Sequence, residues 1–456
     1  MERINQYFKL EQRGSSMKQE LLAGITTFLA MAYILPVNAD ILSATGMPVS
    51  GIFFATVIAS FIAALIMGLV ANYPVALAPG MGINAFFTYT VVIGYGLGWE
   101  AALSAVFISG SLFLLLSVSG LRKMIIDAIP QGLKYAVGAG IGFFITFIGL
   151  TNMGVIVSDP ETFVTLGNLA HPAVLLGVFG LFAVIVLYSM GNRFSLIIAI
   201  ALTAGIGLIL NALGVSNMPY LAQTQEGLLD GASQTFLAAF SGFGELFSHP
   251  SALFIIFTFL FIDFFDTAGT LIGVGSRAGL LDDSGELKDG NKALLADSIG
   301  TVSGSLLGTS TVTSYIESST GIEQGGRTGL TALTVGVLFL LSLIIYPFIG
   351  IFTGVYDPVT DMVYSPVTSM ALVMVGILMI SQLKFIDFDD KPLVIGTFLT
   401  IAFMVFTYSI AEGIAVGFVF YPLAMFASKR HKDVSPIMIG LMIFFLIYFV
   451  LTTLVG

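Results

Sequence analysis

Charged residues and cysteine are the two things that this sequence lacks most plainly. Only 10% of its 456 residues are charged, whereas an average soluble domain carries about 25%. With 57% hydrophobic residues and a mean hydropathy of +0.99, the chain cannot coat a water-facing surface, which excludes a soluble enzyme. The absence of cysteine excludes disulfides, cysteine-ligated zinc and iron–sulfur chemistry, and it leaves the redox compartment undefined.

Motifs for nucleotide hydrolysis and metal binding are missing as well. No G-x-x-x-x-G-K-[ST] phosphate-binding loop occurs, so we do not expect the chain to hydrolyse ATP. Its three histidines, His171, His249 and His431, are scattered along the chain and predict no metal site. We therefore expect no enzyme, no resident cofactor and no nucleic-acid partner.

What the sequence does contain is a series of long apolar runs. A spanning helix takes about 20 residues. Runs close to this length or longer cover residues 21–37, 51–71, 101–120, 132–152, 172–190, 194–214, 250–274, 291–308, 328–350, 367–383, 393–427 and 436–454. Two further segments, 75–92 and 309–322, are apolar but too short or too interrupted to span cleanly. The sequence thus predicts an all-α polytopic membrane protein that crosses the lipid bilayer about 14 times.

The end of the chain is less well defined by its pattern. The run 393–427 is too long for one helix and is read as two crossings. The run 436–454 is then an extra helix, which either spans the bilayer or lies along the bundle.

The positions of lysine and arginine predict the orientation, because positive loops stay on the cytoplasmic side. Residues 1–20 mix basic and acidic side chains and contain no signal-peptide core, so they read as a cytoplasmic N-terminus. Counted from there, all lysines and arginines between 122 and 391 fall inside, while acidic loops that include Asp40 and Asp357 fall outside. This pattern predicts a multi-pass protein of the cell membrane.

An internal repeat relates the two halves of the chain. The string 27–33 (TFLAMAY) resembles 258–264 (TFLFIDF), and each copy precedes one of the two interrupted segments at nearly the same distance. The first copy runs outward and the second inward, so we predict two inverted seven-segment repeats with broken segments 3 and 10. Such repeats are typical of secondary transporters with a site at the bilayer midplane; chance similarity of apolar strings is the alternative.

The two broken segments concentrate residues that suit a ligand site. Pro74, Pro79 and Gly80 predict an extended stretch followed by a half-helix that begins near Met81, because proline disrupts a helix. The hydroxyl-rich stretch 309–314 predicts the same arrangement before Glu317. Helix N-termini that face each other would offer N–H donors to a polar ligand. The alternative is that these small residues only allow close helix packing.

Carboxylates inside the apolar runs are the strongest functional signal. Asp263 and Asp266 share one helix face, and Thr270 follows on the next turn. Asp297 and Glu317 are two further intramembrane acids, and such residues are functional candidates by default. The alternative to a functional role is that some of these acids, above all Asp297, only make structural hydrogen bonds to helix termini. Since no basic side chain lies among them, we expect a proton as counter-charge and assign proton coupling to the acidic set Asp263, Asp266 and Glu317.

Three motifs carry a resemblance to a known family. The stretches 78–84 (APGMGIN), 263–270 (DFFDTAGT) and 313–322 (TSYIESSTGI) resemble the AzgA-like purine permeases of the nucleobase/ascorbate transporter superfamily, and the similarity runs over nearly the whole chain. The resemblance implies proton-coupled import of hypoxanthine, guanine or adenine, driven by the proton gradient. A homodimer is possible in this class.

The resemblance also implies a core domain that moves against a gate domain, with substrate between broken segments 3 and 10. The implied division is a cytoplasmic N-terminus (1–20), core (21–121), gate (122–248), core (249–350) and gate (351–456). The implied substrate residues are Asn84, Asp263, Asp266, Glu317, Thr270, Phe264 and Ser318.

The chemistry of a purine agrees with this set. A purine base carries N–H donors on both of its edges, and a carboxylate accepts two parallel N–H bonds. Glu317 could take the Watson–Crick edge and Asp266 or Asp263 the imidazole edge, while the amide of Asn84 can bond in both directions. An aromatic ring such as that of Phe86, Phe87 or Phe264 could stack on the base.

Two other functions fit parts of the pattern. An inorganic or carboxylate anion carrier could share the inverted-repeat architecture, but the intramembrane carboxylates would repel its substrate. An intramembrane aspartyl protease would need Tyr-Asp and Gly-x-Gly-Asp motifs on two helices. The second motif is absent, and Tyr356-Asp357 lies in a predicted external loop.

Overall fold

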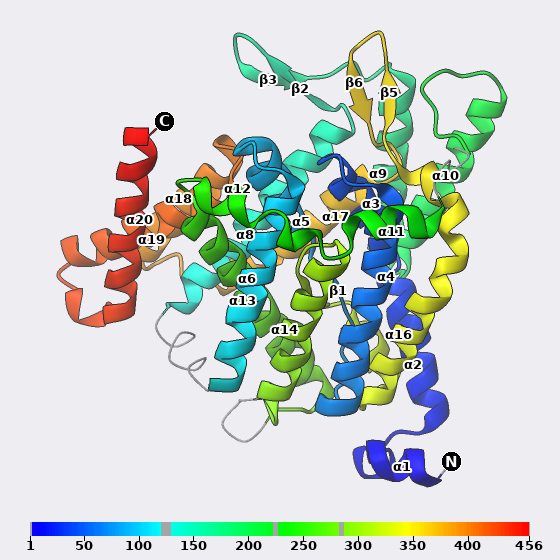
Figure 1. Ribbon diagram of the computed structural model, residues 1–456, viewed down its shortest axis with the longest axis horizontal. Coiled ribbons are helices and arrows are strands. Elements are labelled where there is room, and N and C mark those ends of the chain that lie inside the picture. The colour runs from blue at the N-terminus through cyan, green and yellow to red at the C-terminus, as the bar shows by residue number, and fades with distance from the viewer. Residues whose placement is uncertain (1, 120–128, 222–226, 282–286, 456) are drawn as a thin grey trace.

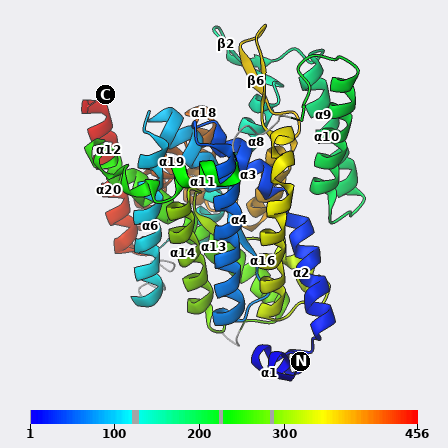
Figure 2. The same cartoon turned by 45° about the vertical axis from the view of Figure 1, so that its right-hand side comes forward.

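The computed structural model describes residues 2–119, 129–221, 227–281 and 287–455. Its long helices run side by side as a bundle, with two β-hairpins projecting at one end and the short N-terminal helix α1 (Glu2–Phe8) at the other (Figure 1). The 45° view shows the same two ends (Figure 2). We call them the hairpin face and the N-terminal face.

The first repeat follows the predicted order of seven segments. Its elements are α2 (Met17–Met31), α3 (Ile34–Ser43), α4 (Val49–Ile66), η2 (Met67–Ala71), β1 (Leu77–Pro79), α5 (Met81–Ala85), the π-helix η3 (Phe86–Gly94), α6 (Trp99–Ser119), α8 (Gln131–Asn152), α9 (Pro172–Ser189) and α10 (Ser195–Ala212). The hairpin of β2 (Ile156–Asp159) and β3 (Phe163–Leu166) joins α8 to α9.

The second repeat has the matching order. Its elements are α13 (Ala252–Ala278), α14 (Gly290–Leu307), β4 (Val312–Ser314), α15 (Ser318–Glu323), α16 (Gly329–Leu341), η5 (Ser342–Phe352), α17 (Ser369–Met379), η6 (Ile380–Phe385), α18 (Lys391–Phe406) and α19 (Ile410–Ala427). The hairpin of β5 (Val355–Asp357) and β6 (Met362–Tyr364) precedes α17.

The predicted spans are confirmed as helices. Within the described residues, nine helices are long and apolar enough to cross a membrane, and the shorter apolar helices are Met81–Gly94, Ser369–Phe385, Lys391–Phe406 and Pro436–Val450. The predicted run 291–308 forms the 18-residue helix α14, which contains Lys292 and Asp297 and is in neither set. The long run 393–427 is divided at Tyr408, whose left-handed backbone (φ 56°) ends α18. The hydroxyl of Ser409 then caps α19 by accepting the Glu412 N–H at 3.3 Å.

The helices pack as two groups, each drawn from both repeats. In the first group α16 packs on α2 and α4, α14 packs on α4 and α6, and α13 packs on α6. In the second group α8 packs on α17 and α18, α18 on α19, and α9 on α10 and α17. Small residues permit the closest contacts: a Cβ on Gly329 would lie 2.0 Å from the carbonyl oxygen of Gly68.

The segment 228–248 packs on the first helix group. It contains α11 (Leu228–Thr235), η4 (Ala238–Phe240) and α12 (Phe243–Ser248), and the sequence assigns it to the gate. In the structure it packs on α4, α6 and α14 of the first group, because its short amphipathic turns cover apolar surface of those helices. A hydrogen bond adds to this packing, since the Thr235 hydroxyl donates to the Leu307 carbonyl at the end of α14 at 2.8 Å.

The N-terminal segment is tied to the first group. The guanidinium of Arg13 donates to the carbonyl oxygens of Asn72 (2.7 Å) and Arg327 (3.0 Å). The carboxylate of Glu20 is fully buried and accepts the Arg327 N–H at 2.9 Å and the Thr331 hydroxyl at 2.6 Å. These bonds join the start of α2 to the start of α16.

The C-terminal helix α20 (Pro436–Val455) lies along the bundle and contacts both groups. It packs on α19, where Phe445 meets Phe418 with ring centroids 5.7 Å apart. It also reaches the first group, because Tyr448 stacks on Phe254 of α13 at 3.7 Å and its hydroxyl lies 3.0 Å from that of Tyr95.

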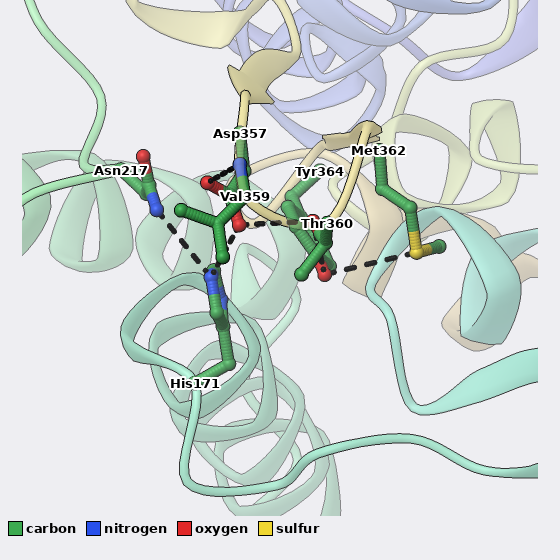
Figure 3. A network of polar contacts seen from close by, with 7 residues as sticks. All are labelled: His171, Asn217, Asp357, Val359, Thr360, Met362 and Tyr364. Carbon is green, nitrogen blue, oxygen red and sulfur yellow. Dashed lines mark hydrogen bonds and ion pairs between the residues drawn. The ribbon is translucent and has the colours of Figure 1, made fainter.

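A polar clasp fixes the β5–β6 hairpin at the hairpin face (Figure 3). Nε2 of His171 lies 3.2 Å from Oδ2 of Asp357 and 3.4 Å from Nδ2 of Asn217. One nitrogen cannot donate to the carboxylate and accept from the amide together, so the shorter bond to Asp357 holds the ring. Tyr364 stacks on that ring at 4.6 Å, which locks the hairpin to the start of α9.

The clasp predicts a pH-dependent contribution to stability. The Val359 N–H, with the Thr360 hydroxyl and His171, holds the pKa of Asp357 below its usual value. A lowered pKa means that the stabilisation is complete above the unfolded-state pKa of about 3.9 and is lost as the pH falls below it. In detergent at pH 7, the melting temperature of the unaltered protein should therefore be higher than that of Asp357→Asn. This difference in melting temperature should shrink toward pH 3.

Glu161→Gln is the matched control, because Glu161 is an exposed acid of the other hairpin. It should melt like the unaltered protein at every pH. A gap for Asp357→Asn that stays constant from pH 7 to pH 3 would contradict the ionic origin.

Candidate functional site

The two broken segments meet as a short antiparallel pair of strands. β1 pairs with β4 in the register Leu77↔Ser314, Ala78↔Thr313 and Pro79↔Val312. Flanking bonds extend the pair, since the Gly80 N–H donates to the Thr311 carbonyl at 3.0 Å. Backbone groups inside a bilayer must be satisfied within the protein, and each strand satisfies the other here. The predicted extended stretches are thereby confirmed.

A half-helix follows each strand, as the sequence predicts. α5 begins at Met81 and continues into η3, while α15 begins at Ser318. Because the strands are antiparallel, the two helices leave from opposite ends of the pair. The close approach depends on Gly80, where a Cβ would lie 2.7 Å from the Thr313 side chain.

Asn84 lies in a buried network of amides and hydroxyls. Its Nδ2 donates to Oδ1 of Asn38 at 2.5 Å, and its Oδ1 accepts from the hydroxyl of Ser310. The amide of Asn38 in turn donates to Thr56 at 2.6 Å and to Thr309 at 3.1 Å. Asn84 thus joins broken segment 3 to broken segment 10 and to α3.

The two aspartates of α13 lie beside β4. Asp263 is buried and accepts the Thr301 hydroxyl at 2.9 Å, while its second oxygen has no partner among the described residues. Asp266 is only partly buried, and the Thr313 hydroxyl lies 3.5 Å from its Oδ2. The structure therefore brings the aspartate pair and the second broken segment together.

Glu317 stands at the start of α15 and is partly buried. Its Oε1 accepts the hydroxyl of Tyr33 at 2.7 Å. α13 packs on both β4 and α15, and Asp266 and Glu317 lie close enough to act on each other electrostatically. Within the described residues, no ion pair involves either carboxylate.

The other predicted residues have different surroundings. Ser318 accepts the Ala76 N–H at 2.9 Å and so ties α15 to β1. Phe264 packs edge-on against Phe113 of α6, with ring centroids 5.5 Å apart. Thr270 is partly buried, one turn beyond Asp266 on the same face of α13.

Two residues near the site were not predicted from the sequence. Tyr33, the partner of Glu317, occupies the position in the first repeat that Phe264 occupies in the second, so the repeat alignment was the signal for it. Asp40 was predicted in an outer loop, but it lies in α3 and is only 8% exposed. Its carboxylate accepts the hydroxyls of Thr368 at 2.6 Å and Ser365 at 3.2 Å, across the boundary between the two helix groups.

Comparison with known proteins identifies the family. A family model described as "Permease family" matches residues 18–416. The chain belongs to this family. A putative permease of Methanocaldococcus jannaschii is 46% identical to this permease, with 99% of each chain covered. A guanine/hypoxanthine permease of Bacillus subtilis is 43% identical, covering 97% of this chain and 99% of the relative. An adenine permease of Escherichia coli is 39% identical, covering 97% and 95%.

Solved structures share the fold of this permease. The transmembrane domain of the cyanobacterial bicarbonate transporter BicA superposes with a TM-score of 0.61 at 17% identity, covering 88% of this chain and 96% of that chain. A murine anion transporter of solute carrier family 26 superposes with a TM-score of 0.57 at 11% identity, covering 90% and 68%. At these identities the likeness establishes the inverted-repeat fold alone.

The Asn84 network predicts a measurable cost of truncation. Asn84→Ala leaves the buried groups of Asn38 and Ser310 without their partners, which costs about 1–3 kcal/mol per orphaned group. We expect a lower melting temperature in detergent and weaker protection of residues 77–94 from hydrogen exchange.

Thr26→Ala is the control for this measurement, because among the described residues that hydroxyl bonds to the Leu22 carbonyl of its own helix and to no other group. It should melt close to the unaltered protein. Equal melting temperatures for the two variants would remove Asn84 from the structural network.

Proposed function

We propose that this permease imports purine nucleobases (hypoxanthine, guanine or adenine) by proton symport. The observation that carries the proposal is the pairing of Asp266 and Glu317 beside the β1–β4 crossing, both partly buried and neither in an ion pair of the described residues. Carboxylates without a basic partner suit a neutral ligand rich in N–H donors. The names of the B. subtilis and E. coli relatives support the same substrate class.

The geometry supports separate tasks for the site residues. Asp266, Glu317 and Thr270 have surface left to meet a base, and we assign them direct contact with it. Asn84 and Ser318 hold the two broken segments in register, while buried Asp263 accepts the Thr301 hydroxyl at 2.9 Å. Phe264, packed against α6, would stack on a base only after its ring has turned away from Phe113.

We further propose that transport follows alternating access, with a core moving against a gate. The core comprises residues 21–121 and 249–350 together with the packed segment 228–248, and the remaining helices form the gate. Contacts across this boundary support a state closed at the hairpin face: Asp40 bonds to Thr368 at 2.6 Å, and Asn152 bonds to Tyr89 at 2.8 Å. We place that face outside and the N-terminal face in the cytoplasm.

The test is uptake of radiolabelled hypoxanthine into proteoliposomes that contain the purified protein. An inward proton gradient should increase uptake, and a protonophore should abolish the increase. Unlabelled guanine or adenine should compete, whereas uracil, bicarbonate and sulfate should not. Competition by an anion, or uptake indifferent to the gradient and the protonophore, would contradict the proposal.

Glu317 should set the affinity for the base. Glu317→Gln replaces one acceptor oxygen by an N–H donor, so a charge-assisted bond worth about 1.5–3 kcal/mol is lost and the half-saturating concentration of guanine should rise tenfold or more. Tyr33→Phe keeps the carboxylate and removes only its 2.7 Å partner, so it should have a smaller effect.

Asp289→Asn is the control at the start of α14, where the exposed carboxylate pairs with Lys292 of the same helix at 3.2 Å. It should leave the half-saturating concentration unchanged. Unchanged affinity and purine selectivity in Glu317→Gln would remove Glu317 from the site.

A further inference from the structure

Asp297 is a buried acid that the proposed substrate site does not use. It lies in α14 and is 0% exposed. Its Oδ1 accepts the hydroxyls of Thr267 at 2.8 Å and Ser314 at 3.3 Å, whereas its buried Oδ2 has no hydrogen-bond partner among the described residues. An ionised carboxylate with one unsolvated oxygen is costly in such surroundings. A protonated one is not, because the bare oxygen then carries little charge.

A chain of hydroxyls connects Asp297 to the substrate site. The Thr267 hydroxyl lies 2.8 Å from that of Thr313, and Thr313 lies 3.5 Å from Oδ2 of Asp266. Thr267 and Thr313 are 0% and 2% exposed, so water does not compete along the path. The four groups form one connected line: Asp266 of α13, Thr313 of β4, Thr267 of α13 and Asp297 of α14.

Counting hydrogens along this line shows that one is missing. The line has three links, Asp266–Thr313, Thr313–Thr267 and Thr267–Asp297, and each link needs one hydrogen. The two hydroxyls supply only two, since a hydroxyl carries one hydrogen. With both aspartates ionised and the two 2.8 Å links made, the 3.5 Å contact between Thr313 and Asp266 holds no hydrogen. A single carboxyl proton at either end completes the line.

We propose that Asp297 is the proton-storage site of the permease, exchanging one proton with Asp266 through the hydroxyls of Thr313 and Thr267. When the proton leaves Asp266, Thr313 receives it and passes its own hydrogen to Thr267. Thr267 then passes its hydrogen to Oδ1 of Asp297. Every oxygen on the path gains one hydrogen and loses one, apart from the two carboxylates, which exchange protonation states.

This assignment rests on the proposed function and gives its proton a location. Asp266 becomes ionised, and able to accept N–H bonds from a base, only while Asp297 holds the proton. The path leaves out Asp263, whose hydroxyl partner Thr301 donates to it at 2.9 Å from outside the line. Uptake of the base and uptake of the proton are thereby linked by two hydroxyl groups.

Few other titratable groups face Asp297. Asp263 and Asp266 of α13 act on it electrostatically. Of the other elements packed on α14, five carry no titratable residue: α4, η2, β1, β4 and η4. α6 carries Glu100 in its first turn, and α11 carries Asp230.

The test separates exchange of the base from accumulation of the base. In proteoliposomes, exchange of labelled for unlabelled hypoxanthine at equal pH needs no net proton movement, whereas accumulation against a gradient does. Thr267→Val removes the hydroxyl and keeps the shape, so exchange should persist while gradient-driven accumulation and hypoxanthine-dependent acidification of the lumen fall about tenfold or more. Asp297→Asn should behave in the same way.

Two matched variants keep the test decisive. Thr267→Ser retains the hydroxyl and should restore accumulation. Thr331→Val removes a buried hydroxyl that bonds to the Glu20 carboxylate at 2.6 Å, off the path, and should accumulate hypoxanthine normally. The relay would be overturned if Thr267→Val accumulates hypoxanthine as well as Thr267→Ser does. It would also be overturned if both variants lose hypoxanthine exchange. If the unaltered protein shows no proton-driven uptake, the proposed function itself fails, which is a distinct result.

Discussion

The rest of this structure depends on the satisfaction of backbone polar groups inside a bilayer. A helix satisfies its own amides, but a chain that stops being helical at mid-membrane must find partners elsewhere. The permease solves this problem with two interrupted segments that complete each other as β1 and β4. Neither strand has a partner without the other, so the inverted halves must fold around a shared centre.

The strand pair explains why polar side chains gather inside the helix bundle, where burying them costs the most free energy. The ends of the strand pair leave N–H and carbonyl groups that side chains must complete, as Ser318 does for Ala76 and Tyr315 does for the Pro79 carbonyl at 2.5 Å. Once hydroxyls and amides are in place, acids such as Asp263 and Asp297 can be buried with hydrogen-bond donors in place of basic partners. The arrangement therefore gathers hydrogen-bond acceptors around the strand pair.

Much of this could be predicted from the sequence, because local chemistry decides it. Proline and glycine at 79 and 80 end a helix wherever they occur, and apolar runs reveal spans without tertiary information. Partners remote in the chain could not be predicted. Asp40 looks like a loop residue until Thr368, more than 300 positions later, is seen to donate to it. Phe264 shares a motif with Asp263 and Asp266, yet its helical position turns its ring toward α6.

The C-terminal helix α20 has a mechanical consequence. Tyr448 and Phe445 both contact Phe254 of α13 in one helix group, while Phe445 also meets Phe418 of α19 in the other. A sliding movement between the groups would either separate Tyr448 from Phe254 or carry α20 with one of the groups. α20 therefore bridges the two helix groups, and neither group can move past this helix without breaking one set of its ring contacts.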